Sequence, residues 1–229
     1  MKHIPILFST EMVQAIIAGR KTQTRRIVKM RKAEITDAKW GYTTFTPERH
    51  ISVRGVHANG QYGESFIPCP YGQVGDILWV RETWACAITT KRFWHFKADG
   101  EKPTSATKWK PSIHMPKAAA RIWLKIVSLK VERLQQINEK DALHEGVEHS
   151  HHFFKDYLPT HQELAHVTIM TTAQASFRTL WQSINGFESW DANPWVWVIE
   201  FKRIPQPKNP LSIQTPQKTK KTRQNKKKA

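Results

Sequence analysis

Residues 19–26 bring together a lysine, two threonines and three arginines, a combination that can support nucleophilic catalysis. A hydroxyl attacks only when a base removes its proton, and a lysine can do so when burial or nearby positive charge lowers its pKa from about 10.4. Lys21 is therefore a candidate base and Thr24 a candidate nucleophile, with Arg25 and Arg26 as candidate substrate-binding residues. A lysine and a threonine at this spacing are common by chance, so a solvated basic strand edge is the alternative.

A carboxylate lies at the end of a predicted short helix. Asn138 is a favourable N-cap for a helix over residues 139–145, and Gly146 suits the position after its end. The helix thus delivers Glu145 to its C-terminus, where the helix dipole disfavours an anion. This position points to a functional carboxylate, and the alternative is an ordinary residue at a helix end.

Three further candidates follow the apolar strand predicted over residues 77–80. Arg81 and Glu82 stand where that strand enters polar sequence, and Trp84 follows them. Glu82 could supply an extra carboxylate in a cleft, and Trp84 a surface on which a base stacks. We expect all three to bind substrate; the alternative is a buried ion pair beside a core aromatic.

The sequence predicts neither a metal site nor a cofactor. Several histidines follow the predicted helix 139–145 without regular spacing, which is typical of a solvated loop: His144, His149, His151, His152 and His161. Two cysteines, Cys69 and Cys86, are too few for a disulfide framework or a four-cysteine zinc site. Dinucleotide, P-loop and HExxH motifs are absent, so nicotinamide, nucleotide-triphosphate and zinc-protease chemistry are unsupported.

Composition indicates a folded, strongly basic protein. The 229 residues carry 36 lysines and arginines against 19 aspartates and glutamates, a net charge of +17, and 39% are hydrophobic. No apolar run reaches the roughly 18 residues of a membrane span, and residues 1–9 do not resemble a secretory signal. We expect a cytoplasmic protein without a membrane partner.

The basic charge is concentrated at the C-terminal end. From Pro205 onward there is no acidic residue, four prolines interrupt the chain, and few apolar residues could form a core. We expect residues 205–229 to be a disordered arm that binds polyanions through counterion release. The alternative is a tail that only maintains solubility. The candidate nucleic-acid contacts are Lys218, Lys220, Lys221, Arg223, Lys226, Lys227 and Lys228.

Apolar spacing predicts more strands than helices. Strands are expected over residues 4–8, 77–80, 121–134 and 195–201 and after a turn near residue 21, with helices over 12–17, 139–145 and 177–184. The expected fold class is α+β, a small β-barrel with short flanking helices. We expect one domain over residues 1–204, with insertions at about 30–74 and 147–171, followed by the tail.

Four motifs, taken in order, resemble the ASCH-domain family, whose fold looks like the PUA domains of RNA-modifying proteins. They are Gly-Arg-Lys-Thr-x-Thr at 19–24, Gly-Asp-x-Leu-Trp-Val-Arg-Glu-Thr-Trp at 75–84, Glu-Lys-x-Ala-x-x-Glu at 139–145, and Val-Trp-Val-Ile-Glu-Phe at 196–201. The resemblance covers most of residues 4–201 and is nearest to ASCH-related proteins of phages and prophages. It implies a PUA-like barrel with a cleft between barrel and helices.

One bacterial branch of this family is an amidohydrolase that removes the acyl group from N4-acetylcytidine. Its motifs match Lys21 as base, Thr24 as nucleophile and Glu145 as the group that manages protons. The resemblance implies an amidohydrolase acting on an N4-acylcytidine-type nucleoside or a related modified nucleobase. The alternatives are a non-catalytic RNA- or DNA-binding module of the PUA-like class and a ribonuclease. The two insertions depart from that branch and could reshape or cover its cleft.

Overall fold

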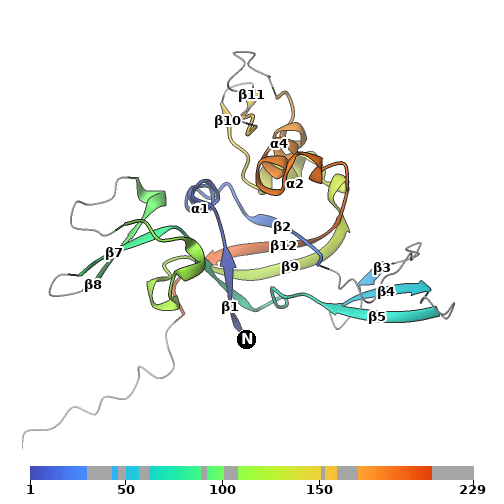
Figure 1. The fold of residues 1–229 in the computed structure, drawn as a ribbon, viewed down its shortest axis with the longest axis horizontal. Coiled ribbons are helices and arrows are strands. Elements are labelled where there is room, and N and C mark those ends of the chain that lie inside the picture. Colours follow the sequence, from blue (N-terminus) through green and yellow to red (C-terminus); the bar gives the residue numbers. More distant parts are fainter. Residues whose placement is uncertain are drawn as a thin grey trace, which may run out of the picture.

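A five-stranded mixed sheet forms the centre of the protein (Figure 1). The computed structural model describes residues 1–29, 43–45, 50–56, 62–88, 92–100, 108–150, 153–158 and 170–207. The sheet contains, in order, β1 (His3–Leu7), β6 (Ile77–Arg81), β9 (Trp123–Arg133), β12 (Trp195–Ile204) and β2 (Gln23–Ile27). Only β1 and β6 are parallel, and the other neighbours are antiparallel. The α+β class is confirmed by this arrangement.

Three α-helices begin at side-chain caps. They are α1 (Thr10–Ile17), α2 (Glu139–His144) and α4 (Ala173–Asn185). Ser9, Asn138 and Thr172 each accept a hydrogen bond from a backbone N–H in the first turn, as N-cap residues do. The predicted helices at residues 12–17, 139–145 and 177–184 are confirmed.

The two faces of the sheet are buried against different helices. Because side chains alternate along a strand, Trp197 and Ile199 of β12 pack into a core with α1, whereas Val196 and Val198 pack with α2 and α4. β2 forms one edge of the sheet, so it runs between the helix on one face and the helices on the other. A site at this edge can draw side chains from both layers.

Smaller sheets lie outside the central one (Figure 1). Within the predicted insertion at 30–74, β3 (Thr43–Phe45), β4 (His50–Val56) and β5 (Tyr62–Pro68) form an antiparallel sheet. β7 (Trp84–Ile88) pairs with β8 (Arg92–Phe96), and β10 (His149–Ser150) with β11 (Phe153–Phe154). Short 3-10 helices are η2 (Lys97–Asp99), η3 (Ser112–His114), η4 (Lys117–Ala119), η5 (Leu134–Gln136) and η6 (Phe187–Ser189).

A β-bulge interrupts the long β9–β12 pair. Phe201 pairs with Ile126 and Glu200 pairs with Ser128, which leaves Val127 as an extra residue in β9. The bulge reverses the alternation of β9, so Ile126 and Leu129 both reach the core that packs with α1. The alternation of apolar residues along 121–134 therefore breaks at the bulge.

Among the described residues, no helix has the length and apolar character needed to cross a membrane.

Candidate functional site

The ends of α1 and α2 meet at a close backbone contact. After α1 the chain turns through Gly19, whose φ is +75°, and the N–H of Arg20 donates to Ala15 O at 2.9 Å. α2 is followed by Gly146, whose φ is +89°, and a Cβ there would lie 2.8 Å from the Cβ of Lys21. The positive φ favours glycine at both positions, and at Gly146 a side chain would also collide with Lys21. The contact sets Lys21 beside the end of α2.

Lys21 and Glu145 form a buried ion pair at this junction. The Lys21 Nζ donates to Glu145 Oε2 at 2.7 Å and to the Glu145 backbone oxygen at 2.8 Å, and both side chains are almost fully buried. The ammonium thus neutralises the carboxylate and also binds a carbonyl at the negative end of the α2 dipole. The ion pair with Lys21 thus offsets the unfavourable interaction of the Glu145 carboxylate with the dipole of α2.

Burial also changes the acidity of Lys21. Desolvation lowers the pKa of the ammonium below its ordinary 10.5, assisted by the positive charges of Arg26 and Arg25, although Glu145 acts in the opposite direction. A lysine with a lowered pKa releases its proton more readily, as a general base must.

Arg25 extends the ion pair into a cluster of six charged residues, called here the Lys21 cluster. Its Nη1 donates to Glu145 Oε1 at 3.1 Å, and its Nη2 donates to Glu132 at 2.6 Å and to Asp141 at 3.1 Å. Lys130 also pairs with Glu132 and Asp141. Three cations and three carboxylates balance, so the cluster carries no net charge, with Lys130 as its exposed member.

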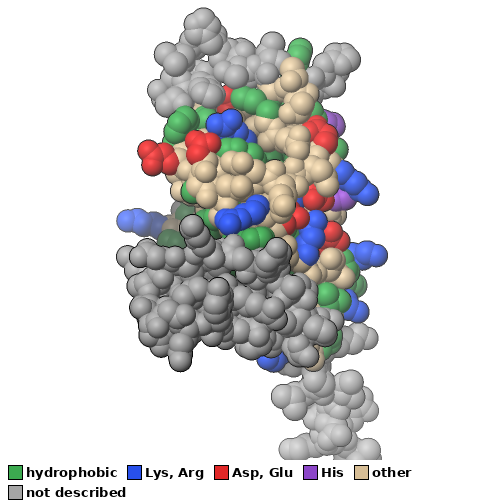
Figure 2. All heavy atoms as spheres, turned by 90° about the vertical axis from the view of Figure 1, so that its right-hand side faces the viewer, with side chains coloured by type: hydrophobic (Ala, Val, Ile, Leu, Met, Phe, Trp, Pro, Cys, Tyr) green, Lys and Arg blue, Asp and Glu red, His purple; other side chains and the backbone are tan. Residues whose placement is uncertain are grey.

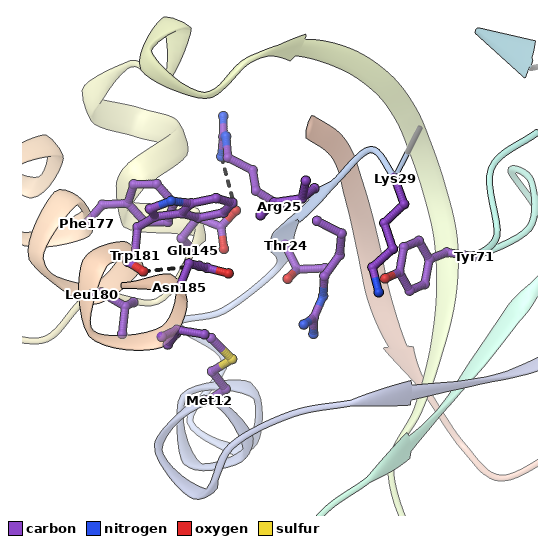
Figure 3. Close-up of a pocket in the computed structure, with 13 residues that line it drawn as sticks. Met12, Thr24, Arg25, Lys29, Tyr71, Glu145, Phe177, Leu180, Trp181 and Asn185 are labelled. Atoms are coloured by element: carbon purple, nitrogen blue, oxygen red, sulfur yellow. Dashed lines mark hydrogen bonds and ion pairs between the residues drawn. The ribbon is translucent and has the colours of Figure 1, made fainter. Parts of the chain in front are cut away.

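A pocket of about 190 Å³ opens beside the cluster at the edge of the sheet (Figure 3). Thr24 of β2 and Glu145 both line it, whereas Lys21 stands behind Glu145 and reaches it through that carboxylate. Helix α4 supplies an apolar wall, and Lys29 and Tyr71 lie on the opposite side (Figure 3). The wall consists of Phe177, Leu180, Trp181 and Ile184, with Met12 contributed by α1.

The free edge of β2 adds backbone groups to the pocket. Val28 N–H donates to Trp195 O, and Thr22 O accepts from Phe201 N–H, so the even-numbered residues of this strand bond to β12. Because bonding alternates along an antiparallel strand, the N–H and C=O of Arg25 and Ile27 point away from β12, toward the edge. Among the described strands none pairs with that edge. Both residues line the pocket, which therefore offers backbone donors and acceptors to a ligand.

Several buried nitrogen atoms around the pocket have no hydrogen-bond partner within the described part of the chain. They include Trp181 Nε1, Arg25 Nε and Arg26 Nε, all of which are donors on lining residues. Nearly all buried donors in proteins are paired, so a concentration of unpaired ones marks a place where a ligand or water completes the bonding. The pocket favours a ligand rich in acceptors.

The predicted site residues separate into two groups. Lys21, Thr24, Arg25 and Arg26 come together with Glu145 at the pocket edge, although Glu145 lies more than a hundred positions further along the chain. The other three predicted residues are absent from its lining: Arg81, Glu82 and Trp84.

Those three belong to a second region. Glu82 forms a bidentate pair with Arg121 at 3.0 and 2.9 Å, and burial raises the pKa of this carboxyl. Trp84 lies in a third core, 5.3 Å from the ring of Trp94, and Arg81 Nε donates to Met115 O at 3.1 Å. A buried ion pair and a core aromatic, the alternative that the sequence offered, describe Glu82 and Trp84.

Sequence reasoning missed half of the Lys21 cluster and the α4 wall of the pocket. Asp141 lies four residues before Glu145, and Phe177 lies four before Trp181, so both pairs share a helix face. In a predicted helix, this spacing could have identified Asp141 and Phe177 as neighbours of Glu145 and Trp181. For Glu132 and Lys130 the sequence held none, because only the pairing of β9 with β12 brings them near Arg25.

Some residues named from the sequence lie outside the described ranges. These are the histidines His151, His152 and His161, and the seven basic tail residues from Lys218 to Lys228. Among the described residues no group of three or more histidine, cysteine, aspartate or glutamate side chains could hold a metal ion. Burial raises the pKa of the Cys69 thiol to about 11, which makes it a poor nucleophile.

Comparisons with protein-family models, curated proteins and solved structures find no match to this chain.

Proposed function

We propose that the protein is an ASCH-family amidohydrolase that removes the acyl group from an N4-acylcytidine-type nucleoside. The observation that carries the proposal is the buried Lys21–Glu145 pair, directly behind a pocket whose lining includes Thr24. The resemblance to the amidohydrolase branch implies a base, a nucleophile and a proton-managing carboxylate at these three residues. Their meeting at one pocket is what such a reaction requires.

The first half of the reaction uses the hydroxyl of Thr24. In its neutral form, which the pKa lowered by burial makes accessible, Lys21 takes the Thr24 proton through the Glu145 carboxylate while Thr24 Oγ1 attacks the amide carbonyl. Arg25 Nε, a buried donor without a partner among the described residues, stabilises the negative charge that develops on the carbonyl oxygen.

The second half releases both products. The C–N bond breaks and the exocyclic amine leaves as cytidine, with a proton relayed from Lys21 by Glu145, which binds its ammonium directly. The acyl group is then an ester of Thr24. Water cleaves this ester, which releases a carboxylic acid and restores the hydroxyl.

The pocket also suits a pyrimidine base. Phe177, Leu180 and Trp181 form an apolar wall for a flat ring, and the free backbone groups of Arg25 and Ile27 can bond its polar edge.

The bulge in β9 is consistent with the PUA-like barrel that the proposal includes, because bulges increase the bend and twist of paired strands.

Hydrolysis of N4-acetylcytidine to cytidine, followed by liquid chromatography, tests the proposal. The wild-type protein is expected to turn over, and Lys21→Met, which preserves the buried chain but removes the amine, is expected to lose at least about 10²-fold in kcat. A folded wild-type protein that leaves N4-acetylcytidine intact would overturn the proposal.

Nucleic-acid binding is the second candidate function, and the net charge of +17 favours it. Figure 2 shows basic and acidic side chains interspersed over the described part of one face, so that face has no single basic patch.

Removing residues 208–229 deletes eight lysines and arginines and leaves a net charge of +9 (17 minus 8). If the tail binds RNA or DNA, its deletion will flatten the dependence of affinity on salt. Cleavage of the RNA in the same assay would indicate the ribonuclease instead.

A further inference from the structure

The pocket has two chemically different halves. On one side are Thr24 and Glu145 with the neutral Lys21 cluster behind them. On the other side are Arg26 and Lys29, together with the hydroxyl of Tyr71. In Figure 3, Lys29 and Tyr71 lie across the pocket from the α4 residues. The proposed reaction uses only the first half.

The second half carries two positive side chains that form no ion pair with a carboxylate among the described residues. Arg26 Nη2 donates to the backbone oxygen of Leu7 at 2.6 Å, and its guanidinium stands 5.1 Å from the centre of the Phe8 ring. These contacts hold Arg26 in place but contribute no negative charge. Neither Arg26 nor Lys29 forms an ion pair with a carboxylate among the described residues.

Arg26 is half-buried beside the pocket. Burial lowers the pKa of its guanidinium, with smaller opposing effects from Tyr71 and Glu145. Its Nε is buried and has no hydrogen-bond partner in the part of the chain that the structure describes. A guanidinium whose Nε–H is buried and unused gains from an anion bound beside it, and arginine is suited to phosphate oxygens because its planar group can donate several hydrogen bonds.

Thr24 and Arg26 lie on the same face of β2. They are two residues apart and therefore separated by about 7 Å along the strand. A ligand whose acyl group meets Thr24 can thus extend a second group toward Arg26 and Lys29. That second group must be anionic to match the charge of this half.

We propose that Arg26, Lys29 and Tyr71 form a phosphate subsite, so that the preferred ligand is a pyrimidine nucleotide rather than a nucleoside. This inference rests on the proposed function for the base and acyl group. The phosphate subsite itself is tested by binding, which needs no turnover.

Isothermal titration calorimetry of the wild-type protein with cytidine 5′-monophosphate and with cytidine provides the test. The nucleotide is expected to bind at least about tenfold more tightly at low salt, and inorganic phosphate is expected to compete with it. Arg26→Gln and Lys29→Ala should each remove most of this preference. Lys125→Ala, at an exposed position on β9, is the matched control and should retain it.

Equal affinity for nucleotide and nucleoside, or an unchanged preference in the folded Lys29→Ala protein, would overturn the phosphate subsite. Lys29 is exposed, so its substitution leaves the fold intact even if Arg26→Gln does not. A preference for the nucleotide without hydrolysis of N4-acetylcytidine would reject the amidohydrolase and keep the subsite. Hydrolysis without any preference would do the reverse.

Discussion

Glu145 and Glu82 are both buried carboxylates bonded to an arginine, yet their surroundings differ. Glu145 is shared between two cations, with Lys21 at 2.7 Å and Arg25 at 3.1 Å, and it lines the pocket. Glu82 binds one arginine through both oxygens, lies outside the pocket, and has a raised pKa because of its burial. Arg121 links it onward to Asp99, whose side chain is 54% exposed.

The difference shows that burial and ion pairing do not by themselves mark a reactive group. The pair of Glu82 and Arg121 joins the end of β6 to the start of β9 and to η2, which is a structural role. The Lys21 cluster contains a lysine, which can release its proton, and it borders a pocket with unpaired donors. Arginine cannot act in this way because it stays protonated. The Lys21 cluster thus differs from the Glu82–Arg121 pair in two ways: it borders the pocket, and it contains a lysine that can release a proton.

The largest difference between the two glutamates is expected in catalysis. Glu145→Gln removes the carboxylate that binds Lys21 and should lower kcat for N4-acetylcytidine by about 10³-fold, within the range of general acid–base effects. Glu82→Gln should leave kcat of the folded protein unchanged. Steady-state kinetics of the two variants side by side will measure this, and equal losses would abolish the distinction.

Stability should respond at Glu82 even though catalysis does not. Glu82→Gln leaves Arg121 with a neutral partner, and breaking a buried pair typically costs about 3–5 kcal/mol. We expect about 2 kcal/mol here, because Arg121 is 29% exposed and keeps Asp99. Urea denaturation followed by tryptophan fluorescence measures the change. A loss of unfolding free energy below about 0.5 kcal/mol would show that this ion pair does not stabilise the contact between the end of β6 and the start of β9.

The two regions should also give stability opposite dependences on pH. Folding lowers the pKa of Lys21, so between the folded value and 10.5 the unfolded chain binds more protons and stability rises with pH. Folding raises the pKa of Glu82 above its ordinary 4.5, so stability falls as the pH rises from 4.5 through the folded value.

Unfolding free energies measured from pH 4 to pH 10 test these signs. The wild-type protein should gain stability relative to Lys21→Met toward high pH, and should lose it relative to Glu82→Gln above about pH 4.5. The same sign in both comparisons would contradict the assignment.

The smallest effect is expected at the exposed end of the second region. Asp99→Asn should cost about 0.5 kcal/mol, and less at high salt, because its pair with Arg121 is accessible to water. Thermal unfolding at two salt concentrations measures this. A loss as large as that of Glu82→Gln would mean that Asp99, and not Glu82, holds Arg121.

Local features were predictable from the sequence. The caps Asn138 and Gly146, the apolar spacing of Phe177 and Trp181, and the alternation of residues 195–201 describe elements that the structure contains. These features depend on residues within one turn or one strand. The sequence supports them because capping and periodicity act over a few positions.

Long-range contacts were not predictable in the same way. Lys21 and Glu145 are separated by 124 positions, and only a resemblance to known motifs linked them beforehand. The sequence also gave no sign that Trp84 begins a separate hairpin, because residues 81–84 read as the continuation of one strand. Glu82 was expected at the cleft for that reason. Its partner Arg121, supplied from 39 positions away, decides its role instead.

The most direct test of the proposed site uses the two threonines of one motif. Thr24 is buried and lines the pocket, whereas Thr22 is exposed, so Thr24→Val and Thr22→Val make the same chemical change at two different places. Hydrolysis of N4-acetylcytidine should fall by at least about 10³-fold in Thr24→Val and stay at the wild-type rate in Thr22→Val. Wild-type turnover in a folded Thr24→Val protein would contradict the account.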